Sequence, residues 1–291
     1  MSPLVSVLIP CFRAQSFLPD ALVSLERQHY RPIEVVIISD DGCDYSAFTQ
    51  YVQGLRVIHC STGRIGSGAP NAKNVGLLHA SGAVIAKLDA DDILLPDYLA
   101  RTVPVALRYG ACLTGRQPVD FASLGSIETR NPSRYSELSS GLLSMDDYVH
   151  MTFNWDALYR RDLLALLKWP DQFEEDLYFE AAVFERVGFV PFEKAQSYLY
   201  RMRQGSICNR EETLREVQQS YTMMMQQLDT QPEIYALGKA TAKLLCAELK
   251  QRLSNIAAYL YDRKSGLVPE YSVLVEATQY QRPGGLQLAL A

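Results

Sequence analysis

Short apolar runs separated by acidic and glycine-containing stretches set the pattern of the first ninety residues. The runs cover residues 4–10, 33–39, 55–60 and 83–89, and the first reads "LVSVLIP". They are rich in β-branched residues and end close to proline, glycine or aspartate. Runs of this length and composition are typical of buried strands rather than of helices.

Helical spacing of apolar residues fills the gaps between these runs. Residues 16–28, "SFLPDALVSLERQ", predict a helix with Ser16 as its N-cap, and residues 71–81, "NAKNVGLLHAS", predict a second one. Strands that alternate with helices indicate an α/β fold in which a mostly parallel sheet is flanked by helices.

The rest of the chain follows a different pattern. Residues 110–145 have no strong periodicity and predict a loop, after which residues 153–167 resume helical order. Beyond about residue 210 the sequence is mostly helical, with one apolar stripe formed by Leu245, Leu249, Leu253, Ile256 and Leu260. This stripe has three candidate partners, ranked in this order: the preceding domain, a second copy of the chain in a homodimer, and a membrane surface. The tail from Arg282 is expected to be loose.

Composition narrows the class of protein. The 291 residues are 48% hydrophobic and 21% charged, with a net charge of −5 and no basic cluster, which argues against a nucleic-acid partner. The beginning of the sequence does not resemble a signal peptide, and no apolar run reaches the roughly 20 residues of a membrane span. The six cysteines contain no CxxC pair, so reduced thiols and a cytoplasmic location are expected.

Carboxylates gather where two of the predicted strands end. Asp40 and Asp41 follow one strand, and Asp89, Asp91 and Asp92 follow another. Because ligands of open α/β sheets bind beyond the carboxyl ends of the strands, both sets should face one crevice. An Asp-x-Asp sequence there offers oxygen ligands to a hard divalent cation. The alternatives are a helix cap for the second set and a tight turn for "DDG".

Three separated motifs resemble family 2 glycosyltransferases of the GT-A fold. They are "VSVLIPCFRAQSFLPDALVSLERQHYRPIEVVIISDDG", "NAKNVGLLHASGAVIAKLDADDILLPDYL" and "EEDLYFEAAVFERVGF", and the likeness covers about residues 4–207. The resemblance implies a Rossmann-like GT-A catalytic domain at 1–210, with a nucleotide-sugar half at about 1–100 and an acceptor half at about 101–210. Residues 211–291 would form a helical C-terminal extension.

The resemblance also implies a reaction. A family 2 enzyme moves a sugar, with inversion, from a nucleotide diphosphate sugar to an acceptor hydroxyl, assisted by Mn²⁺ or Mg²⁺ on the diphosphate. A UDP-sugar is the expected donor, a saccharide or another hydroxyl compound the expected acceptor, and polysaccharide or glycoconjugate synthesis the expected role. The other readings are a non-catalytic nucleotide-sugar-binding protein and a nucleotidyltransferase, although the glycine-rich basic motif of the latter is missing after the first strand.

For the donor, the resemblance assigns residues in the first half of the chain. Pro10 and the loop after it would border the nucleotide, and Asp41 or Asp40 would accept the N3 proton of the base. Asp89 and Asp91 would be the metal and ribose residues of the Asp-x-Asp motif. An imide N–H requires an acceptor, and a departing diphosphate requires its charge to be neutralised.

Basic and amide side chains are assigned to the donor as well. Lys73 and Asn74 end the stretch "GRIGSGAPNAKN", residues 63–74, whose first part, residues 63–68, is called the glycine-rich loop here. The family commonly has Arg where Lys73 stands, and a simple surface loop is the alternative. Arg201 and Arg203 would hold the diphosphate opposite the metal, with an exposed basic loop as the alternative. Arg203 stands where the family often has His, so no third metal ligand is assumed there.

The last motif supplies the expected catalytic base. In "EEDLYF", the family likeness makes Asp176 the general base, near the first turn of an amphipathic helix. Glu174, Glu175 and partial burial are expected to raise its basicity. An ordinary helix cap would have the same sequence.

Overall fold

One sheet runs through the described part of the chain, which comprises residues 2–126, 141–149, 155–172, 174–203 and 211–264 of a computed structural model. The strand order is β3-β2-β1-β4-β8-β6-β9-β5, with β7 paired to β9. The strands are β1 (Val5–Cys11), β2 (Ile33–Ser39), β3 (Arg56–Ser61), β4 (Val84–Lys87), β5 (Ile93–Leu94), β6 (Ala111–Asp120), β7 (Gly141–Leu143), β8 (Trp155–Arg160) and β9 (Val190–Met202).

The first four strands form the parallel half of the sheet. β1 lies between β2 and β4, β3 extends the sheet beyond β2, and all these pairs are parallel. Their carboxyl ends therefore meet at one edge, where Asp40 directly follows β2 and Asp89 follows β4 after one residue. The predicted α/β fold with strands at these positions is confirmed.

The second half of the sheet differs from the sequence-based prediction. Residues 111–120, expected to be a loop, form β6, and the segment predicted to be helical contains β8. β8 pairs antiparallel with β4 on one side and β6 on the other, and residues 157–159 are buried. A strand buried on both faces reads as a continuous apolar run, which periodicity cannot separate from a helix.

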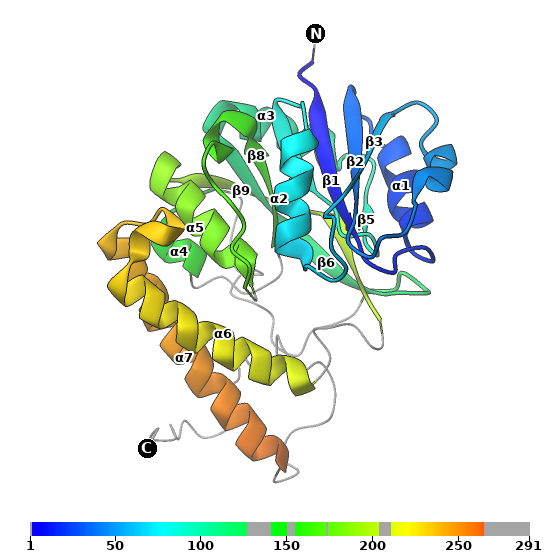
Figure 1. The fold of residues 1–291 in the computed structure, drawn as a ribbon. Helices are drawn as coiled ribbons and strands as arrows, with labels where there is room; N and C mark the ends of the chain where they lie inside the picture. The colour runs from blue at the N-terminus through cyan, green and yellow to red at the C-terminus, as the bar shows by residue number, and fades with distance from the viewer. Residues whose placement is uncertain (1, 127–140, 150–154, 173, 204–210, 265–291) are drawn as a thin grey trace.

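Helices cover both faces of the sheet (Figure 1). Along β1, Val7 and Ile9 pack in the core cluster that contains the apolar side chains of α1, while Leu8 packs in the cluster that contains Ala72 of α2. The helices are α1 (Leu18–Glu26), α2 (Ala69–His79), α3 (Tyr98–Tyr109), α4 (Met145–Val149), α5 (Glu175–Val187), α6 (Glu211–Thr230) and α7 (Lys239–Lys264), with 3₁₀ turns η1 (Ser46–Tyr51), η3 (Arg161–Leu164) and η5 (Pro232–Tyr235).

The predicted N-cap of the first helix is wrong. The structure places Phe17 at this position, without a side-chain capping bond. The amides of Phe17 and Leu18 both donate to the carbonyl of Ala14, each at 2.9 Å. A backbone turn rather than the Ser16 hydroxyl therefore leads the chain into α1.

The two long helices α6 and α7 lie side by side below the sheet in the view of Figure 1. Leu245, Leu249 and Ile256 of the apolar stripe are fully buried, in the same core cluster as Leu177 and Tyr178 of α5. The stripe thus packs within the chain, on the first of its three candidate partners. None of the helices in the described ranges has the length and apolar character needed to cross a membrane. The tail from Arg282 lies outside these ranges.

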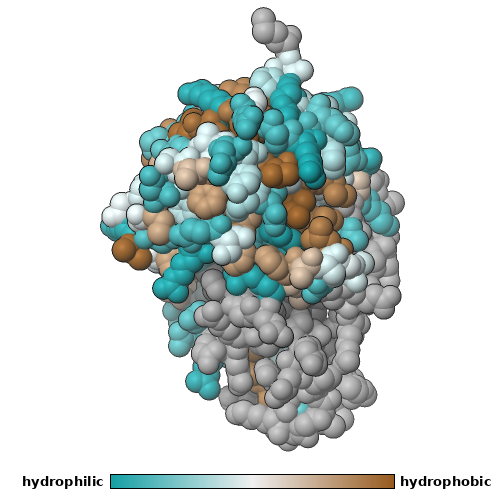
Figure 2. Space-filling model, turned by 90° about the vertical axis from the view of Figure 1, so that its right-hand side faces the viewer, coloured by the Kyte–Doolittle hydropathy of each residue, from teal (hydrophilic) through white to brown (hydrophobic). Residues whose placement is uncertain are grey.

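On the face shown in Figure 2, exposed apolar side chains form small groups that polar side chains separate. Single exposed apolar residues are normal on a folded protein, because polar atoms cannot cover its whole surface. This view therefore gives no reason to assign a large apolar docking surface to that face.

Candidate active site

Asp40 holds the glycine-rich loop that precedes α2. Its carboxylate is buried and accepts hydrogen bonds from the Thr62 hydroxyl at 2.8 Å, the Ser67 amide at 3.1 Å and the Gly68 amide at 2.9 Å. The Ser67 hydroxyl also donates to it. This network uses both carboxylate oxygens, so Asp40 serves the loop rather than presenting a free acceptor to the crevice.

Asp41 stays partly exposed at the edge of the crevice. Its oxygens accept from the amides of Arg13 at 2.7 Å and Cys43 at 3.0 Å, and from the hydroxyls of Ser39 at 3.1 Å and Tyr45 at 2.9 Å. Burial works to raise the pKa of Asp41, but these hydrogen bonds outweigh it and lower the pKa to about 2. Asp41 is therefore a fixed carboxylate that ties the loop after β1 to the loop after β2.

The loop after β1 also carries an aromatic side chain at the crevice. Pro10 lies in β1 opposite Ile38 of β2, and two residues later Phe12 is 47% exposed. A Cβ added at Gly66 would lie 3.7 Å from the Phe12 ring, so this ring faces the glycine-rich loop. Pro10, Phe12, Asp41 and the glycine-rich loop thus come together at the carboxyl edge of the sheet.

Asp89 and Asp91 form the acidic part of the crevice. Burial and the charge of Asp89 raise the pKa of Asp91, while Arg203, whose Nε lies 3.0 Å from an Asp91 oxygen, opposes this shift. Within the described residues, no group of three or more His, Cys, Asp or Glu side chains could hold a metal. Two neighbouring carboxylates nevertheless fit a hard divalent cation that takes its other ligands from phosphate and water.

The third aspartate of this motif has a structural role. Asp92 is fully buried and accepts hydrogen bonds from the Tyr198 hydroxyl and the Arg201 amide, both at 2.8 Å. Burial, together with Asp89 and Asp91, raises the pKa of Asp92 well above its ordinary value. These bonds fasten β9 to the acidic loop.

Arg201 is more enclosed than the sequence suggested. Its guanidinium pairs with Asp20 at 2.7 Å, donates to the Asp91 carbonyl and packs over the Phe121 ring at 4.4 Å. Arg201 is thus buried rather than on an exposed basic loop, and among the described residues none accepts a hydrogen bond from its Nη2. Arg203 is only partly buried and lies directly beside Asp91.

Two lysines surround the carboxylate of Asp176 at the start of α5. The Nζ atoms of Lys73 and Lys87 both lie 3.0 Å from Oδ1, and the indole N–H of Trp169 donates to the same oxygen at 3.0 Å. Lys73 also pairs with Glu175 at 2.6 Å. Among the described residues, none donates to Oδ2 of Asp176, and 29% of this side chain is exposed. One oxygen is thus anchored and the other is available.

The predicted increase in the basicity of Asp176 is wrong. Burial alone would raise its pKa, but the charges of Lys73 and Lys87 outweigh burial and hold the pKa far below its ordinary value. The sequence could not reveal this, because Lys73 and Asp176 are 103 positions apart. Lys73 itself is buried and pairs with both Glu175 and Asp176.

Asn74, the other residue assigned to the phosphates, holds the loop before α5. Its side-chain amide donates to the Trp169 carbonyl at 2.8 Å, and its side-chain oxygen accepts from the Trp169 amide at 2.9 Å. The Trp169 ring stacks on Phe179 with 3.9 Å between ring centroids. Asn74 therefore acts on the site through the position of Trp169.

Sequence reasoning missed Lys87 and its second partner. Lys87 ends β4 and lies 3.4 Å from Glu180, which also accepts the hydroxyls of Tyr148 at 2.7 Å and Tyr159 at 2.8 Å. One indication was present, because a lysine in the apolar run "AVIAKLD" is buried only when a partner compensates its charge. The partner itself could not be named.

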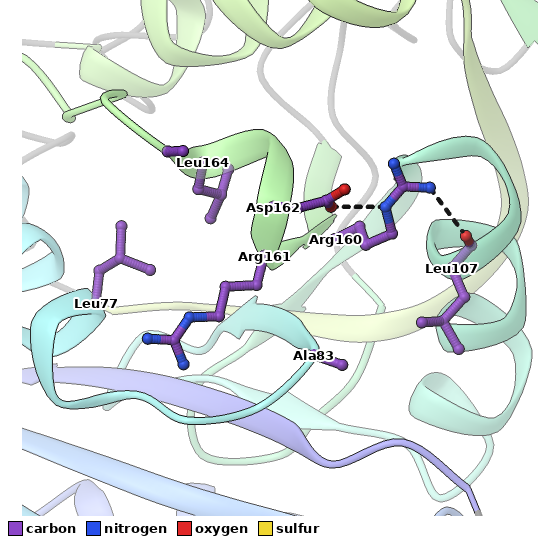
Figure 3. A pocket seen from close by; sticks show the side chains of 8 residues that line it. Leu77, Ala83, Leu107, Arg160, Arg161, Asp162 and Leu164 are labelled. Carbon is purple, nitrogen blue, oxygen red and sulfur yellow. Dashed lines mark hydrogen bonds and ion pairs between the residues drawn. The ribbon is translucent and has the colours of Figure 1, made fainter.

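Two cavities flank the carboxyl edge of the sheet. One of about 350 Å³ is lined by Ser39, Gly42 and Tyr45, among others, and another of about 440 Å³ lies between the glycine-rich loop and Asn74. A larger cavity of about 600 Å³ opens at the opposite edge, where Ala83 precedes β4 and Arg160 ends β8 (Figure 3). There Arg160 binds Asp162 at 2.6 Å and the Leu107 carbonyl at 3.3 Å, away from the acidic crevice.

Comparison with known proteins assigns the family. Residues 6–167, more than half of the chain, match the model of glycosyl transferase family 2. The chain belongs to glycosyl transferase family 2. A relative described as the uncharacterized glycosyltransferase EpsJ of Bacillus subtilis is 25% identical over 222 residues, which is 71% of this chain and 63% of EpsJ. The chain thus spans slightly less than two thirds of this curated relative.

Solved structures agree with the family 2 fold. TarS of S. aureus, in complex with UDP-GlcNAc, superimposes with a TM-score of 0.63 and 17% identity. The match covers 90% of this chain and 74% of the TarS chain. The mannosyltransferase PcManGT of Pyrobaculum calidifontis, in complex with GDP-Man and Mn²⁺, matches 92% of this chain and 81% of its own with a TM-score of 0.57 and 17% identity. The GT-A fold expected from the three motifs is confirmed.

Proposed function

We propose that the chain transfers a sugar from a nucleotide diphosphate sugar to an acceptor hydroxyl with inversion, and that Asp176 is the general base. The arrangement of Asp176 carries this proposal. Its Oδ1 is fixed by Lys73, Lys87 and Trp169, while Oδ2 accepts no hydrogen bond from the described residues and belongs to a partly exposed side chain. A positioned, ionised carboxylate is the group that activation of an alcohol requires.

The nucleotide is proposed to bind between Phe12, Asp41 and the glycine-rich loop. Asp41 suits the N–H of the base better than Asp40, because Asp40 is buried whereas Asp41 stays partly exposed at the crevice. The exposed Phe12 ring offers a face for stacking. TarS in complex with UDP-GlcNAc supports a UDP-sugar as the donor to test first, and PcManGT in complex with GDP-Man makes a GDP-sugar the second.

Asp89 and Asp91 would hold Mn²⁺ or Mg²⁺, which would neutralise charge on the departing diphosphate when bound. PcManGT, solved with Mn²⁺, supports this choice of ion. Arg203, 3.0 Å from Asp91, supplies a positive charge on the same side of the crevice. The enclosed position of Arg201 makes it a support for the acidic loop in this proposal.

The reaction then follows from the placement of Asp176. Its free oxygen takes the proton of the acceptor hydroxyl while the hydroxyl oxygen forms a bond to the anomeric carbon. The bond between that carbon and the diphosphate oxygen breaks on the opposite face, and the nucleoside diphosphate leaves with the electron pair. Lys73 and Lys87 keep Asp176 ionised at neutral pH, so the base is ready before the acceptor binds.

The biological setting is proposed more broadly. A hydroxyl acceptor in polysaccharide or glycoconjugate synthesis, used in the cytoplasm, is consistent with family 2 membership. A homodimer and a peripheral membrane contact through the C-terminal helices remain predictions. The burial of the apolar stripe within the chain gives them no support.

A donor panel tests the proposed function. Purified protein is incubated with UDP-Glc, UDP-GlcNAc and GDP-Man, with Mn²⁺ or Mg²⁺ or with EDTA, and thermal shift and slow hydrolysis are measured. We expect one donor to raise the unfolding temperature and to be hydrolysed only with metal. The anomeric configuration of a product formed on a model acceptor then tests inversion.

The rival functions give different outcomes. A thermal shift without hydrolysis or transfer in the parent protein would favour a non-catalytic nucleotide-sugar binder. Release of pyrophosphate from a nucleoside triphosphate and a sugar phosphate would favour a nucleotidyltransferase. If none of these donors shifts the unfolding temperature, the proposed donor class is wrong.

A further inference from the structure

The turn that leads into α5 has an unusual backbone. Glu174, the residue before the helix, has φ 58° and ψ 40°, which is the left-handed region. A residue with a Cβ adopts this conformation only rarely. Glu175 and Asp176 follow directly, so the direction of this turn decides where both carboxylates point.

The side chain of Glu174 is held by the two C-terminal helices. It is 6% exposed, lies 3.2 Å from the Arg252 guanidinium of α7 and accepts the hydroxyl of Tyr221 of α6. Arg252 is itself 3% exposed and pairs with Glu248 at 2.8 Å. A buried carboxylate requires such partners, so the helices fix Glu174 in this place.

A second contact of Arg252 reaches α4. Its Nη2 donates to the Val149 carbonyl, at the end of α4, at 3.4 Å. The neighbouring Tyr148 donates to Glu180 at 2.7 Å and lies 3.5 Å from the backbone carbonyl of Asp176. Arg252 thus links the end of α4 to Glu174, the residue directly before α5, whose second residue is Asp176.

From these contacts we infer that Arg252 is a positioning residue for the base: acting through Glu174, it holds the turn that directs Asp176 toward the crevice. The inference rests on the proposed function for its catalytic meaning. It gives the C-terminal helices a role in the reaction, in addition to covering the apolar core.

The test compares two contacts between α5 and the C-terminal helices. Arg252→Met removes the contact beside Asp176, and Arg252→Lys keeps its charge. The matched control is Glu185→Gln, because Glu185 lies near the other end of α5 and accepts the Gly238 amide at 3.1 Å and the Thr241 hydroxyl. We expect Arg252→Met to lower kcat for transfer about tenfold or more, with donor Kd within about threefold. Arg252→Lys should recover part of kcat, and Glu185→Gln should leave it within about twofold.

A second readout does not depend on activity. Hydrogen exchange of the backbone amides of residues 177–181 should be at least about tenfold faster in Arg252→Met than in the parent and in Glu185→Gln. Unchanged exchange in Arg252→Met would overturn the inference, whether or not the parent is active. A parent that is inactive with every donor would refute only the proposed function. If Arg252→Met does not fold, Glu174→Gln replaces it, because Arg252 is inferred to act through the Glu174 carboxylate. Unchanged exchange and kcat in that variant would overturn the inference equally.

Discussion

Two lysines and Trp169 hold one carboxylate oxygen of Asp176, and the other oxygen accepts no hydrogen bond from the described residues. A substitution can therefore remove the proposed base while keeping the side chain in place. Asp176→Asn keeps the size of the side chain and removes the base. We expect kcat for transfer to fall by about a hundred- to ten-thousand-fold, with donor Kd nearly unchanged in the presence of metal. Parallel measurement of kcat and of donor Kd checks this. A kcat within a few-fold of the parent would make Asp176 a helix cap and Glu175 the next candidate base.

The lysines beside Asp176 predict a pH dependence. Because Lys73 lowers the pKa of Asp176, its removal in Lys73→Met raises that pKa and protonates the base at a higher pH. Lys73→Met should therefore lose kcat on the acid side at a higher pH than the parent, in which Asp176 stays ionised well into the acid range. The exposed Lys168 on the surface provides the control variant Lys168→Met. Coinciding acid limbs in all three proteins would contradict the role of Lys73.

Asp91 predicts a metal dependence. Asp91→Asn keeps the shape of the side chain and removes a charged oxygen ligand, so metal-dependent donor binding should weaken at least about tenfold while the fold survives. Calorimetry of donor binding with Mn²⁺ and with EDTA measures the effect. If metal-dependent binding and activity are undiminished, the assignment of Asp91 is wrong.

For individual residues, the sequence predicted the positions of the carboxylates at the edge of the sheet better than it predicted their surroundings. Asp41, Asp89 and Asp91 could be placed in one crevice because parallel strands end at one edge. The burial of Lys73 and Arg201 could not be predicted, because their partners come from distant segments. The four hydrogen bonds that Asp41 accepts, which join two loops, could not be predicted from the sequence either.

Among the elements, α2 lies unusually close to the sheet. A Cβ added at Gly76 would lie 2.8 Å from Cδ1 of the buried Ile38. Gly76→Val should therefore lower the free energy of unfolding by about 1–3 kcal/mol. Leu78→Ala on the same helix changes an exposed side chain and should stay within about 0.5 kcal/mol. Urea unfolding of both variants checks this, and equal stabilities would contradict the close packing.

The elements also show where periodicity fails. β1, β2 and β4 were predictable because each is a short apolar run beside a helix of clear period. β6 contains Gly115, Arg116 and Pro118, and Arg116 pairs with Asp156 of β8 at 3.4 Å. Polar residues and glycine inside the sheet interrupt the run of apolar residues by which a buried strand is recognised in a sequence.

For the whole molecule, the buried stripe of α7 predicts the effect of truncation. A chain that ends near residue 228 lacks α7 and exposes the apolar surface that Leu245, Leu249 and Ile256 cover. We expect it to aggregate or to unfold at a lower temperature. Size-exclusion chromatography with light scattering and a thermal melt measure this, and a monodisperse, fully active truncated protein would contradict it.

A matched pair of variants tests the same surface in the full-length chain. Leu249→Asp places a charge in the core, whereas Lys250→Asp changes the exposed neighbouring residue. The first should lower the unfolding temperature strongly, and the second should change it little. Equal effects would show that the stripe does not stabilise the fold.

The hydrogen bonds of Asp40 to Thr62, Ser67 and Gly68 have a consequence for binding. They fix the glycine-rich loop before any donor arrives. A loop that is ordered on binding loses conformational entropy, at about 0.5–1.5 kcal/mol for each immobilised side chain. Here that entropy is already lost during folding. A donor therefore binds more tightly than it would if the same contacts had to order a flexible loop.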